Sequence, residues 1–162
     1  MEKLNSRFFS EFSPEALKNG FSNVFSDWRL ARKFGKITKI ILRAGFIVDG
    51  IAFEYDRTFR TKNHGGEGGG ERVFELKDNE YVKRIEVSTG AYKYSPVRAV
   101  CKISFTTNAG RVFSGGEARE CSGIRAEVFE AGKGEQIFAL AGTFGAYLAS
   151  IEGVYVKPEP QT

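Results

Sequence analysis

After residue 36 the chain carries short segments rich in apolar, β-branched and aromatic residues, separated by turn residues, and this pattern predicts β-strands. The strongest patterns cover 37–42 and 51–55, 81–87 and 100–106, and 137–140 and 148–156. Each pair of strands is joined through a glycine-containing bend, at Gly45, Gly90 and Gly145. Shorter strand patterns lie between the pairs at 72–76, 111–113 and 126–129. The repeat predicts three similar strand–bend–strand units that share one core with pseudo-threefold symmetry.

The first 35 residues follow a different pattern. Ser13-Pro14-Glu15 is typical of a helix start, because serine caps free N–H groups and proline fits the first helical position. The apolar residues that follow recur at helical spacing: Leu17, Phe21, Val24, Phe25 and Trp28. We therefore predict an N-terminal extension, 1–35, with an amphipathic helix near 14–26. An all-β domain follows at 36–157, and residues 158–162 form a tail.

The composition is that of a globular domain. The chain has 162 residues, of which 41% are hydrophobic and 27% are charged, and this length suits one domain with a buried core. The net charge of +4 favours weak attraction to acidic surfaces. The densest basic group, within 29–39, is interpreted as a solvated face, because charge runs alone discriminate poorly between partners. We predict no nucleic-acid partner.

Two features bear on location. The N-terminus has no continuous apolar leader, and no stretch approaches the roughly 20 apolar residues of a membrane-spanning helix. We expect a protein that is cytoplasmic, or exported without a conventional signal peptide. Cys101 and Cys121 leave two possibilities open: they could form one bridge, or Cys101 could be a small buried residue of its strand.

Catalytic chemistry has little support in this sequence. The only histidine is His64, which excludes a metal cluster or relay built on several histidines. It borders the glycine cluster 65–70 and could touch a ligand there, although lone histidines are usually structural. The cluster lacks the Gly-Lys-Ser/Thr ending of a phosphate-binding loop. It is either a flexible hairpin loop or a surface that exposes backbone amides to a ligand. We predict no enzymatic activity, no metal site and no cofactor.

An ordered set of short motifs resembles the jacalin-related lectin family. The motifs lie at 51–55, 64–69, 76–82, 103–108, Phe129 and 153–156. The resemblance implies an all-β fold, a β-prism of three four-stranded Greek-key sheets, which agrees with the three units described above. It also implies a protein that binds sugars without a metal, a cofactor or enzymatic chemistry.

In that family the usual sugar site is a Gly-x-x-x-Asp bend near the C-terminus, where the aspartate accepts hydrogen bonds from adjacent hydroxyls. The matching positions here are Gly145, Ala146, Tyr147 and Ala149. Ala149 stands in place of the aspartate, and a methyl group accepts no hydrogen bond. The family's N-terminal glycine-rich loop is also replaced, by the segment around Trp28. The resemblance therefore implies that the usual site is lost.

Mannose-binding members with two sites carry a second Gly-x-x-x-Asp motif in the bend between the first pair of strands. That bend reads Gly45-Phe46-Ile47-Val48-Asp49 here, with the aspartate present. By resemblance, Asp49 accepts from two hydroxyls, and the N–H groups of Phe46 and Ile47 donate. The companion glycine loop matches 65–69, so that Gly65 or Gly66 donates from the other side. The third bend, 90–94, has no aspartate.

The sequence thus predicts a carbohydrate-binding protein that recognises glycans of the mannose or glucose type at Asp49. Three alternatives stay open. Asp49 precedes Gly50 and could bond only its own turn. The domain could have lost sugar binding and serve as a protein–protein interaction module, or its basic surface could bind anionic glycans. A homo-oligomer is also possible, because weak single sites become useful when several act together.

Overall fold

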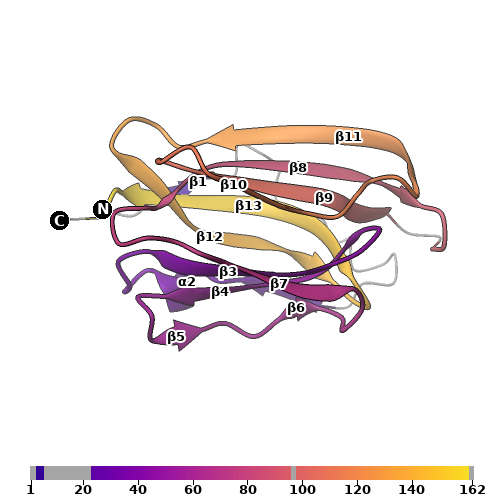
Figure 1. The fold of residues 1–162 in the computed structure, drawn as a ribbon, viewed down its shortest axis with the longest axis horizontal. Coiled ribbons are helices and arrows are strands. Elements are labelled where there is room, and N and C mark those ends of the chain that lie inside the picture. The colour runs from indigo at the N-terminus through magenta and orange to yellow at the C-terminus, as the bar shows by residue number, and fades with distance from the viewer. Residues whose placement is uncertain (1–2, 6–22, 96–97, 161–162) are drawn as a thin grey trace.

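The computed structural model describes residues 3–5, 23–95 and 98–160, which form three antiparallel sheets around one core (Figure 1). The first sheet has the order β1 (Lys3–Asn5), β13 (Leu148–Pro158), β12 (Glu135–Phe144), β2 (Asn23–Ser26). The second has the order β10 (Val112–Gly115), β9 (Arg98–Thr107), β8 (Val82–Tyr92), β11 (Cys121–Glu130). The third has the order β5 (Phe59–Arg60), β4 (Val48–Tyr55), β3 (Ile37–Ala44), β7 (Gly70–Glu75), with β6 (His64–Gly65) beside β4.

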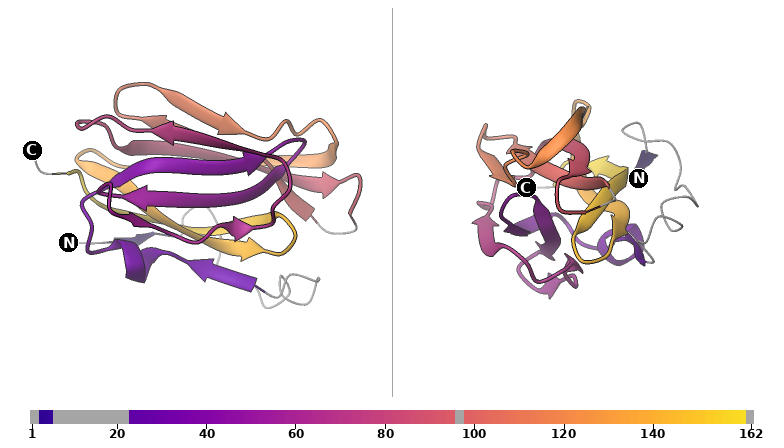
Figure 2. Two further views of the ribbon diagram at one scale, coloured as in Figure 1. Left: turned by 60° about the horizontal axis from the view of Figure 1, so that its bottom comes forward. Right: turned by 90° about the vertical axis from the view of Figure 1, so that its right-hand side faces the viewer.

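The three sheets surround a common centre, as the end-on view in Figure 2 shows, and each contributes buried apolar side chains to the shared core. Ile40, Ile85 and Ile151, one from each sheet, are completely buried. The sheets also meet through a polar contact, in which the Tyr55 hydroxyl donates to the Phe138 carbonyl at 2.7 Å. Burial of these alternate positions provides the main driving force for the fold. The predicted all-β prism is confirmed.

Two of the predicted bends are built alike. The N–H of Gly45 donates to the carbonyl of Ile47 in the β3–β4 bend, over 3.0 Å. The N–H of Gly145 donates to the carbonyl of Tyr147 in the β12–β13 bend, also over 3.0 Å. Both bends lie at the same end of the prism, at the right in Figure 1. The pseudo-symmetry of the sequence repeat therefore extends to the hydrogen bonding of these two bends.

The prediction of a third bend at Gly90 is wrong. Gly90 lies inside β8, where it pairs with Ala99 of β9. A Cβ atom at this position would lie 2.9 Å from the Ser122 carbonyl oxygen of β11. The glycine is needed for this close approach between strands rather than for a turn. The strand continues to Tyr92, so the chain reverses further along than the pattern indicated.

The predicted helix near 14–26 is also corrected in part. Residues 14–22 lie outside the described residues, but 23–26 form β2, which pairs with β12. Phe25 is buried and its neighbours are exposed, which is the two-residue period of a strand with one face on the core. Backbone pairing with the edge of β12 outweighs the helical spacing of the apolar residues. In the part of the chain that is described, no helix is long and apolar enough to cross a membrane.

Three side chains link the sheets at the end of the prism opposite the two bends. Lys36, just before β3, donates to two carbonyls in the loop that leads into β8. Lys83 of β8 donates to two carbonyls in the loop that leads into β12. Gln136 of β12 donates to the Gly35 carbonyl in the loop that leads into β3. We call this cyclic arrangement of Lys36, Lys83 and Gln136 the end ring.

A disulfide joins Cys101 of β9 to Cys121 at the start of β11. Of the two possibilities left open by the sequence, the structure therefore has the bridge. The intervening chain includes loop 116–120, in which the Ala118 N–H donates to the Cys101 carbonyl over 3.2 Å. The bridge thus fixes a loop at the same end of the prism as the Gly45 bend.

Replacing Cys121 with serine should lower the free energy of unfolding by about 2–4 kcal/mol, because the unfolded chain regains the freedom that the cross-link removes. Thermal unfolding with and without dithiothreitol provides the measurement. The reductant should lower the wild-type melting temperature to that of Cys121→Ser and leave the variant unchanged. A wild-type protein that melts identically in both conditions would contradict a stabilising bridge.

Candidate functional site

The Gly45 bend borders an open cavity of about 270 Å³ at the end of the prism. The residues that line it come from the Gly45 bend, from β4 and β8, and from two loops: Gly45, Phe46, Ile47, Asp49, Gly69, Tyr92 and Glu117. Four of the predicted site residues therefore lie together. Asp49 occupies the second position of β4, and the strand fixes the direction of its side chain.

A glycine loop, residues 65–69, wraps around Asp49. The N–H of Gly66 donates to the Asp49 backbone carbonyl over 2.9 Å. The Asp49 carboxylate lies over the next two glycines, since a Cβ atom on Gly68 would be 2.7 Å from Oδ1 and one on Gly69 would be 2.5 Å from Oδ2. The absence of side chains in this loop leaves the space that the carboxylate occupies.

Arg43 of β3 holds the glycine loop in place. Its guanidinium donates to the backbone carbonyls of Glu67, Gly68 and Gly69, over 2.8–3.2 Å. Three bonds from one rigid, planar donor fix a segment that has little conformational preference of its own. Arg43 thus positions the loop from behind and indirectly sets the place of the Asp49 carboxylate.

The expectation for Gly65 and Gly66 needs correction. Gly69 lines the cavity beside Asp49, whereas Gly65 pairs with Gly50 in the sheet. The N–H of Gly66 is already bonded to Asp49, so it has no proton to offer a ligand. Register explains the difference, because β6 takes the first glycine of the cluster into the sheet and the second donates its N–H to Asp49, so the free part begins later.

Burial raises the pKa of the Asp49 carboxyl above its usual value, while the positive charge of Arg43 opposes this effect. Burial also raises the pKa of the Tyr92 hydroxyl, and the negative charge of Asp49 adds to it. Glu117 brings a second carboxylate to the cavity. The cavity is therefore acidic and rich in hydrogen-bond acceptors, with an aromatic side chain on one side.

Hydrogen-bond donors come from the backbone of the bend. Outside the strands, no backbone bond among the described residues uses the N–H of Phe46 or Ile47. The Phe46 side chain is 43% exposed and presents an apolar surface at the mouth of the cavity. The bend therefore offers a carboxylate acceptor, two backbone donors and an apolar contact within a few residues. Vicinal hydroxyls on a ring require this combination.

The C-terminal bend has a different environment. Ala149 is buried, and the Tyr147 hydroxyl is hydrogen-bonded to the Ser95 hydroxyl. Gly66 packs directly on this bend, since a Cβ atom there would lie only 2.0 Å from the Ala146 carbonyl oxygen. The C-terminal bend thus offers no acidic acceptor from its predicted site residues, Gly145, Ala146, Tyr147 and Ala149. The loop that contains Gly66 also covers part of this bend.

His64 is a structural residue. Its Nε2 is hydrogen-bonded to both carboxylate oxygens of Asp27, at 2.9 and 3.0 Å, and both side chains are buried. The ring also stacks on Phe25 of β2, with centroids 4.1 Å apart. These contacts tie the first sheet to the third. Lying beside the glycine cluster in the sequence does not place this histidine in the cavity.

Three cavity residues were not predicted from the sequence as ligand-binding residues: Gly69, Tyr92 and Glu117. Gly69 belongs to the cluster that was singled out, but its backbone φ of +65° becomes evident only in the structure. Tyr92 lies within the predicted third bend, 90–94, which has no aspartate. Glu117 follows Gly115-Gly116, a turn signal that gives no indication of which cavity it borders.

An aspartate and free backbone donors at one end of a three-sheet prism define the arrangement of β-prism lectins. The chain belongs to the family of jacalin-like lectin domains, since the model of that family matches residues 20–155. The match begins before residue 36, in agreement with the inclusion of β2 in the first sheet. A comparison with curated protein sequences found no match.

Solved structures support the same family. A mannose-binding jacalin-related lectin from Ananas comosus is 26% identical, with a TM-score of 0.64 and coverage of 76% of this chain and 83% of that chain. Malaysian banana lectin is 24% identical, with a TM-score of 0.68 and coverage of 85% and 91%. Artocarpin in complex with mannotriose is 20% identical, with a TM-score of 0.70 and coverage of 83% and 89%. At these identities the last two show the fold alone.

Proposed function

We propose that this protein is a non-catalytic lectin that binds a neutral glycan of the mannose or glucose type in the Asp49 cavity. One observation supports this most directly: the partly buried Asp49 carboxylate lies beside the N–H groups of Phe46 and Ile47, which take part in none of the backbone hydrogen bonds that the described residues make outside the strands. The mannose-binding relative from Ananas comosus supports the sugar type.

Each residue of the cavity has a role in this proposal. The Asp49 carboxylate accepts hydrogen bonds from two adjacent hydroxyls, and the N–H groups of Phe46 and Ile47 donate to the same sugar. The Phe46 side chain covers an apolar face of the ring, and Tyr92 borders the sugar on its other side. Gly69 keeps the space above the carboxylate free of a side chain. Hydrogen bonds to a charged acceptor are worth about 1.5–3 kcal/mol each, so Asp49 dominates the binding energy.

The charges of the cavity favour a neutral ligand over an anionic one. Asp49 and Glu117 are both acidic and line the same small space, so a sulfate or carboxylate group on the sugar would meet like charge. Anionic glycans are therefore better suited to basic surfaces elsewhere on the chain. A neutral sugar carries its own donors and meets no such repulsion.

The test is a glycan array probed with the wild-type protein and with Asp49→Ala. The wild type should bind mannose- or glucose-terminated glycans, and the variant should lose this binding completely, because weak sugar affinities of about −4 kcal/mol do not survive the loss of their charged acceptor. Glu130→Ala, which removes an exposed carboxylate of β11, is the matched control and should bind normally. Binding that persists in Asp49→Ala would refute the site.

The other outcomes identify the alternatives. A wild-type protein that binds nothing on a broad array would favour a protein–protein interaction module. Binding restricted to sulfated glycans, with strong dependence on salt, would favour recognition by the basic surface. A change of binding with pH distinguishes the Asp49 site, since protonation of this carboxyl at acidic pH removes the acceptor.

We also propose that the protein functions in an oxidising compartment after export. The Cys101–Cys121 disulfide supports this location, because such bridges persist outside the reducing cytosol. Alkylation of free thiols in protein taken from its natural source tests the proposal. Two reactive thiols after unfolding without reductant would contradict it, and would favour a cytoplasmic protein.

A further inference from the structure

β11 is the outermost strand of the second sheet and forms the upper border of the molecule in Figure 1. It has 10 residues, whereas the other edge strands, as far as they are described, have 2 to 6. One side of β11 pairs with β8. Along its other side, no described residue forms a hydrogen bond with the backbone of 124–128. A long strand edge of this kind is a template for a further strand.

The usual protection of a strand edge is missing from β11. Proteins discourage edge pairing with proline or lysine in the strand, or by covering it with another segment. Residues 121–130 contain neither proline nor lysine. A bulge lies between Ser122 and Arg125, but 125–130 stay in continuous register with β8. The later part of β11 is therefore a regular edge that a second strand can extend.

Apolar and charged side chains divide between the two faces of this edge. Ile124 and Val128 are 46% and 47% exposed, and with Ala126 they follow the two-residue period of one face. Arg125 and Glu127 share the other face, with 3.9 Å between Nε and Oε1. The arginine side chain is 75% exposed, so its charge is accessible to a second carboxylate.

The segment 124–128 is complementary to itself. When two copies run antiparallel about a twofold axis at Ala126, Arg125 of each copy lies opposite Glu127 of the other, and Ile124 lies opposite Val128. An axis one position earlier would oppose Arg125 to itself, and an axis one position later would oppose Glu127 to itself. Like charges directly opposite each other are destabilising, so the register centred on Ala126 is favoured over its neighbours.

We propose that β11 is a dimerisation edge whose partner is a second copy of this chain, paired antiparallel through 124–128 with Ala126 on the twofold axis. The second sheets of the two copies then form one continuous sheet. Pairing along one strand buries less surface than the roughly 1,600 Å² of a standard interface, so we expect a dimer that dissociates on dilution. The inference does not rest on the proposed sugar site.

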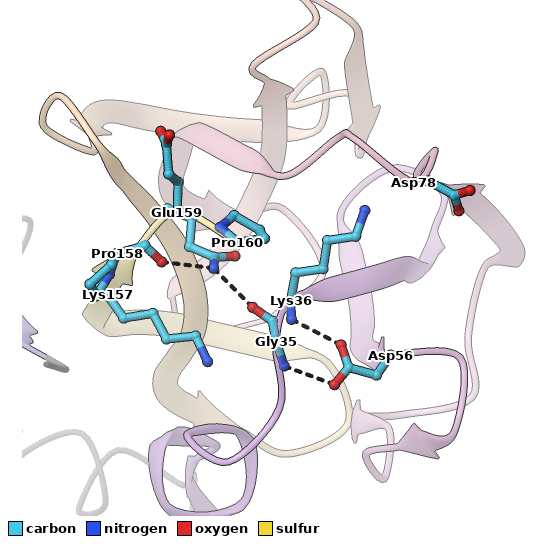
Figure 3. A pocket seen from close by; sticks show the side chains of 9 residues that line it. Gly35, Lys36, Asp56, Asp78, Lys157, Pro158, Glu159 and Pro160 are labelled. Atoms are coloured by element: carbon cyan, nitrogen blue, oxygen red, sulfur yellow. Dashed lines mark hydrogen bonds between the residues drawn. The ribbon is translucent and has the colours of Figure 1, made fainter. Parts of the chain in front are cut away.

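The direction of pairing determines where the two Asp49 cavities lie. β11 begins beside loop 116–120, at the Asp49 end of the prism, and ends at the loop that leads into β12, at the end ring. Each cavity therefore lies on the same side of the dimer as the opposite end of the other copy, where Asp56 accepts from the N–H groups of Gly35 and Lys36 (Figure 3). The two cavities face opposite directions, so one dimer joins two separate surfaces.

Sedimentation equilibrium of the full chain at a series of concentrations tests the proposal. The wild type should show an equilibrium between monomer and dimer. Arg125→Glu places two carboxylates opposite each other at both symmetric positions and should weaken dimerisation about tenfold or more. Glu127→Arg should do the same with two guanidinium groups. Lys102→Glu, at an exposed position of β9, changes the net charge as Arg125→Glu does and should dimerise like the wild type.

A mixture of Arg125→Glu and Glu127→Arg gives the sharpest test, because every opposed pair in the mixed dimer is again of opposite sign. The mixture should dimerise as the wild type does, although neither variant does so alone. Equal dimerisation of the wild type and both single variants would refute β11 as the interface. A wild type that stays monomeric up to about 1 mM would refute self-association and leave the edge to a strand of another protein.

Hydrogen exchange locates the contact on the chain. Backbone N–H groups of 124–128 that point away from β8 should exchange more slowly at high protein concentration than at low concentration, because pairing protects them. Arg125→Glu should lose about tenfold or more of this protection at the same concentration. Concentration-dependent protection of another surface, with 124–128 unchanged, would overturn the proposed edge.

Discussion

Replacing Glu80 with alanine should lower the free energy of unfolding by about 3 kcal/mol, because it removes a buried carboxylate that accepts several hydrogen bonds, while its partner Arg111 stays 37% exposed. Glu80 is 2% exposed. Both of its carboxylate oxygens accept from the Arg111 guanidinium, and Oε2 also accepts from the Thr107 hydroxyl over 2.6 Å. The N–H of Lys77 is a further donor, over 2.9 Å. Alanine leaves all these donors without their acceptor.

The same pair makes stability depend on pH. The hydrogen bonds from Arg111 outweigh the effect of burial and hold the pKa of Glu80 at about 2, below its ordinary value of 4.5. Since the folded-state pKa is the lower one, the contribution is complete above pH 4.5 and is lost as the pH falls toward 2. This difference corresponds to about 3 kcal/mol. Urea unfolding at a series of pH values should show the loss in wild type and a flatter profile in Glu80→Ala.

Asp78→Ala is the matched control for Glu80. Asp78 also pairs with an arginine, Arg57, at 2.7 Å, but its side chain is 79% exposed. Exposed pairs contribute roughly 0–1 kcal/mol, so this variant should unfold almost as the wild type does. If Asp78→Ala and Glu80→Ala lowered the free energy of unfolding by similar amounts, the burial of Glu80 would not determine what its pair with Arg111 contributes.

Replacing Gly69 with alanine should abolish glycan binding at the Asp49 cavity. The added methyl group would lie 2.5 Å from Asp49 Oδ2 and 2.6 Å from the Ala44 carbonyl carbon. The carboxylate must therefore leave the position from which it accepts hydroxyl bonds. The backbone φ of +65° adds strain of about 1–2 kcal/mol for any residue with a side chain.

Gly70→Ala is a matched control one residue away, because a Cβ atom at Gly70 would meet nothing within 4 Å. Titration with methyl α-D-mannopyranoside and a thermal melt should be made for both variants. Gly70→Ala should keep the sugar binding and the stability of the wild type. Gly69→Ala should lose sugar binding and part of the stability. Normal sugar affinity in Gly69→Ala would show that the carboxylate does not act from its present position.

The strands were predictable because each predicted segment is a short run rich in apolar, β-branched and aromatic residues. In β8 and β9 these residues alternate between a buried and a more exposed face, whereas β12 is buried almost throughout. The same reasoning located Asp49, since a bend between two strong strand patterns can be recognised locally. It failed at Gly90, where a glycine serves a close contact with Ser122 on another strand. It failed at 23–26, because pairing with β12 decides the conformation and that strand is more than a hundred residues away.

The composition of the cavity was the least predictable part. Tyr92 lies in the second sheet and Glu117 in a loop between two of its strands, whereas Asp49 lies in the third sheet and Gly69 in a loop between two of that sheet's strands. Only the packing of the sheets around a common axis brings these residues together, and no short stretch of sequence encodes that arrangement. The Glu80–Arg111 pair cannot be predicted locally for the same reason, since its two residues are 31 positions apart in the sequence.

The end ring has a consequence for how the prism comes apart. Each sheet supplies a donor to the loop that introduces the next sheet, and the third of these links returns to the first. Detaching any one sheet breaks two links, the one through which it donates to a neighbour and the one through which it accepts from the other. A state with two intact sheets and one unfolded sheet is therefore penalised twice. Amide hydrogens in all three sheets should exchange through one common global opening rather than sheet by sheet.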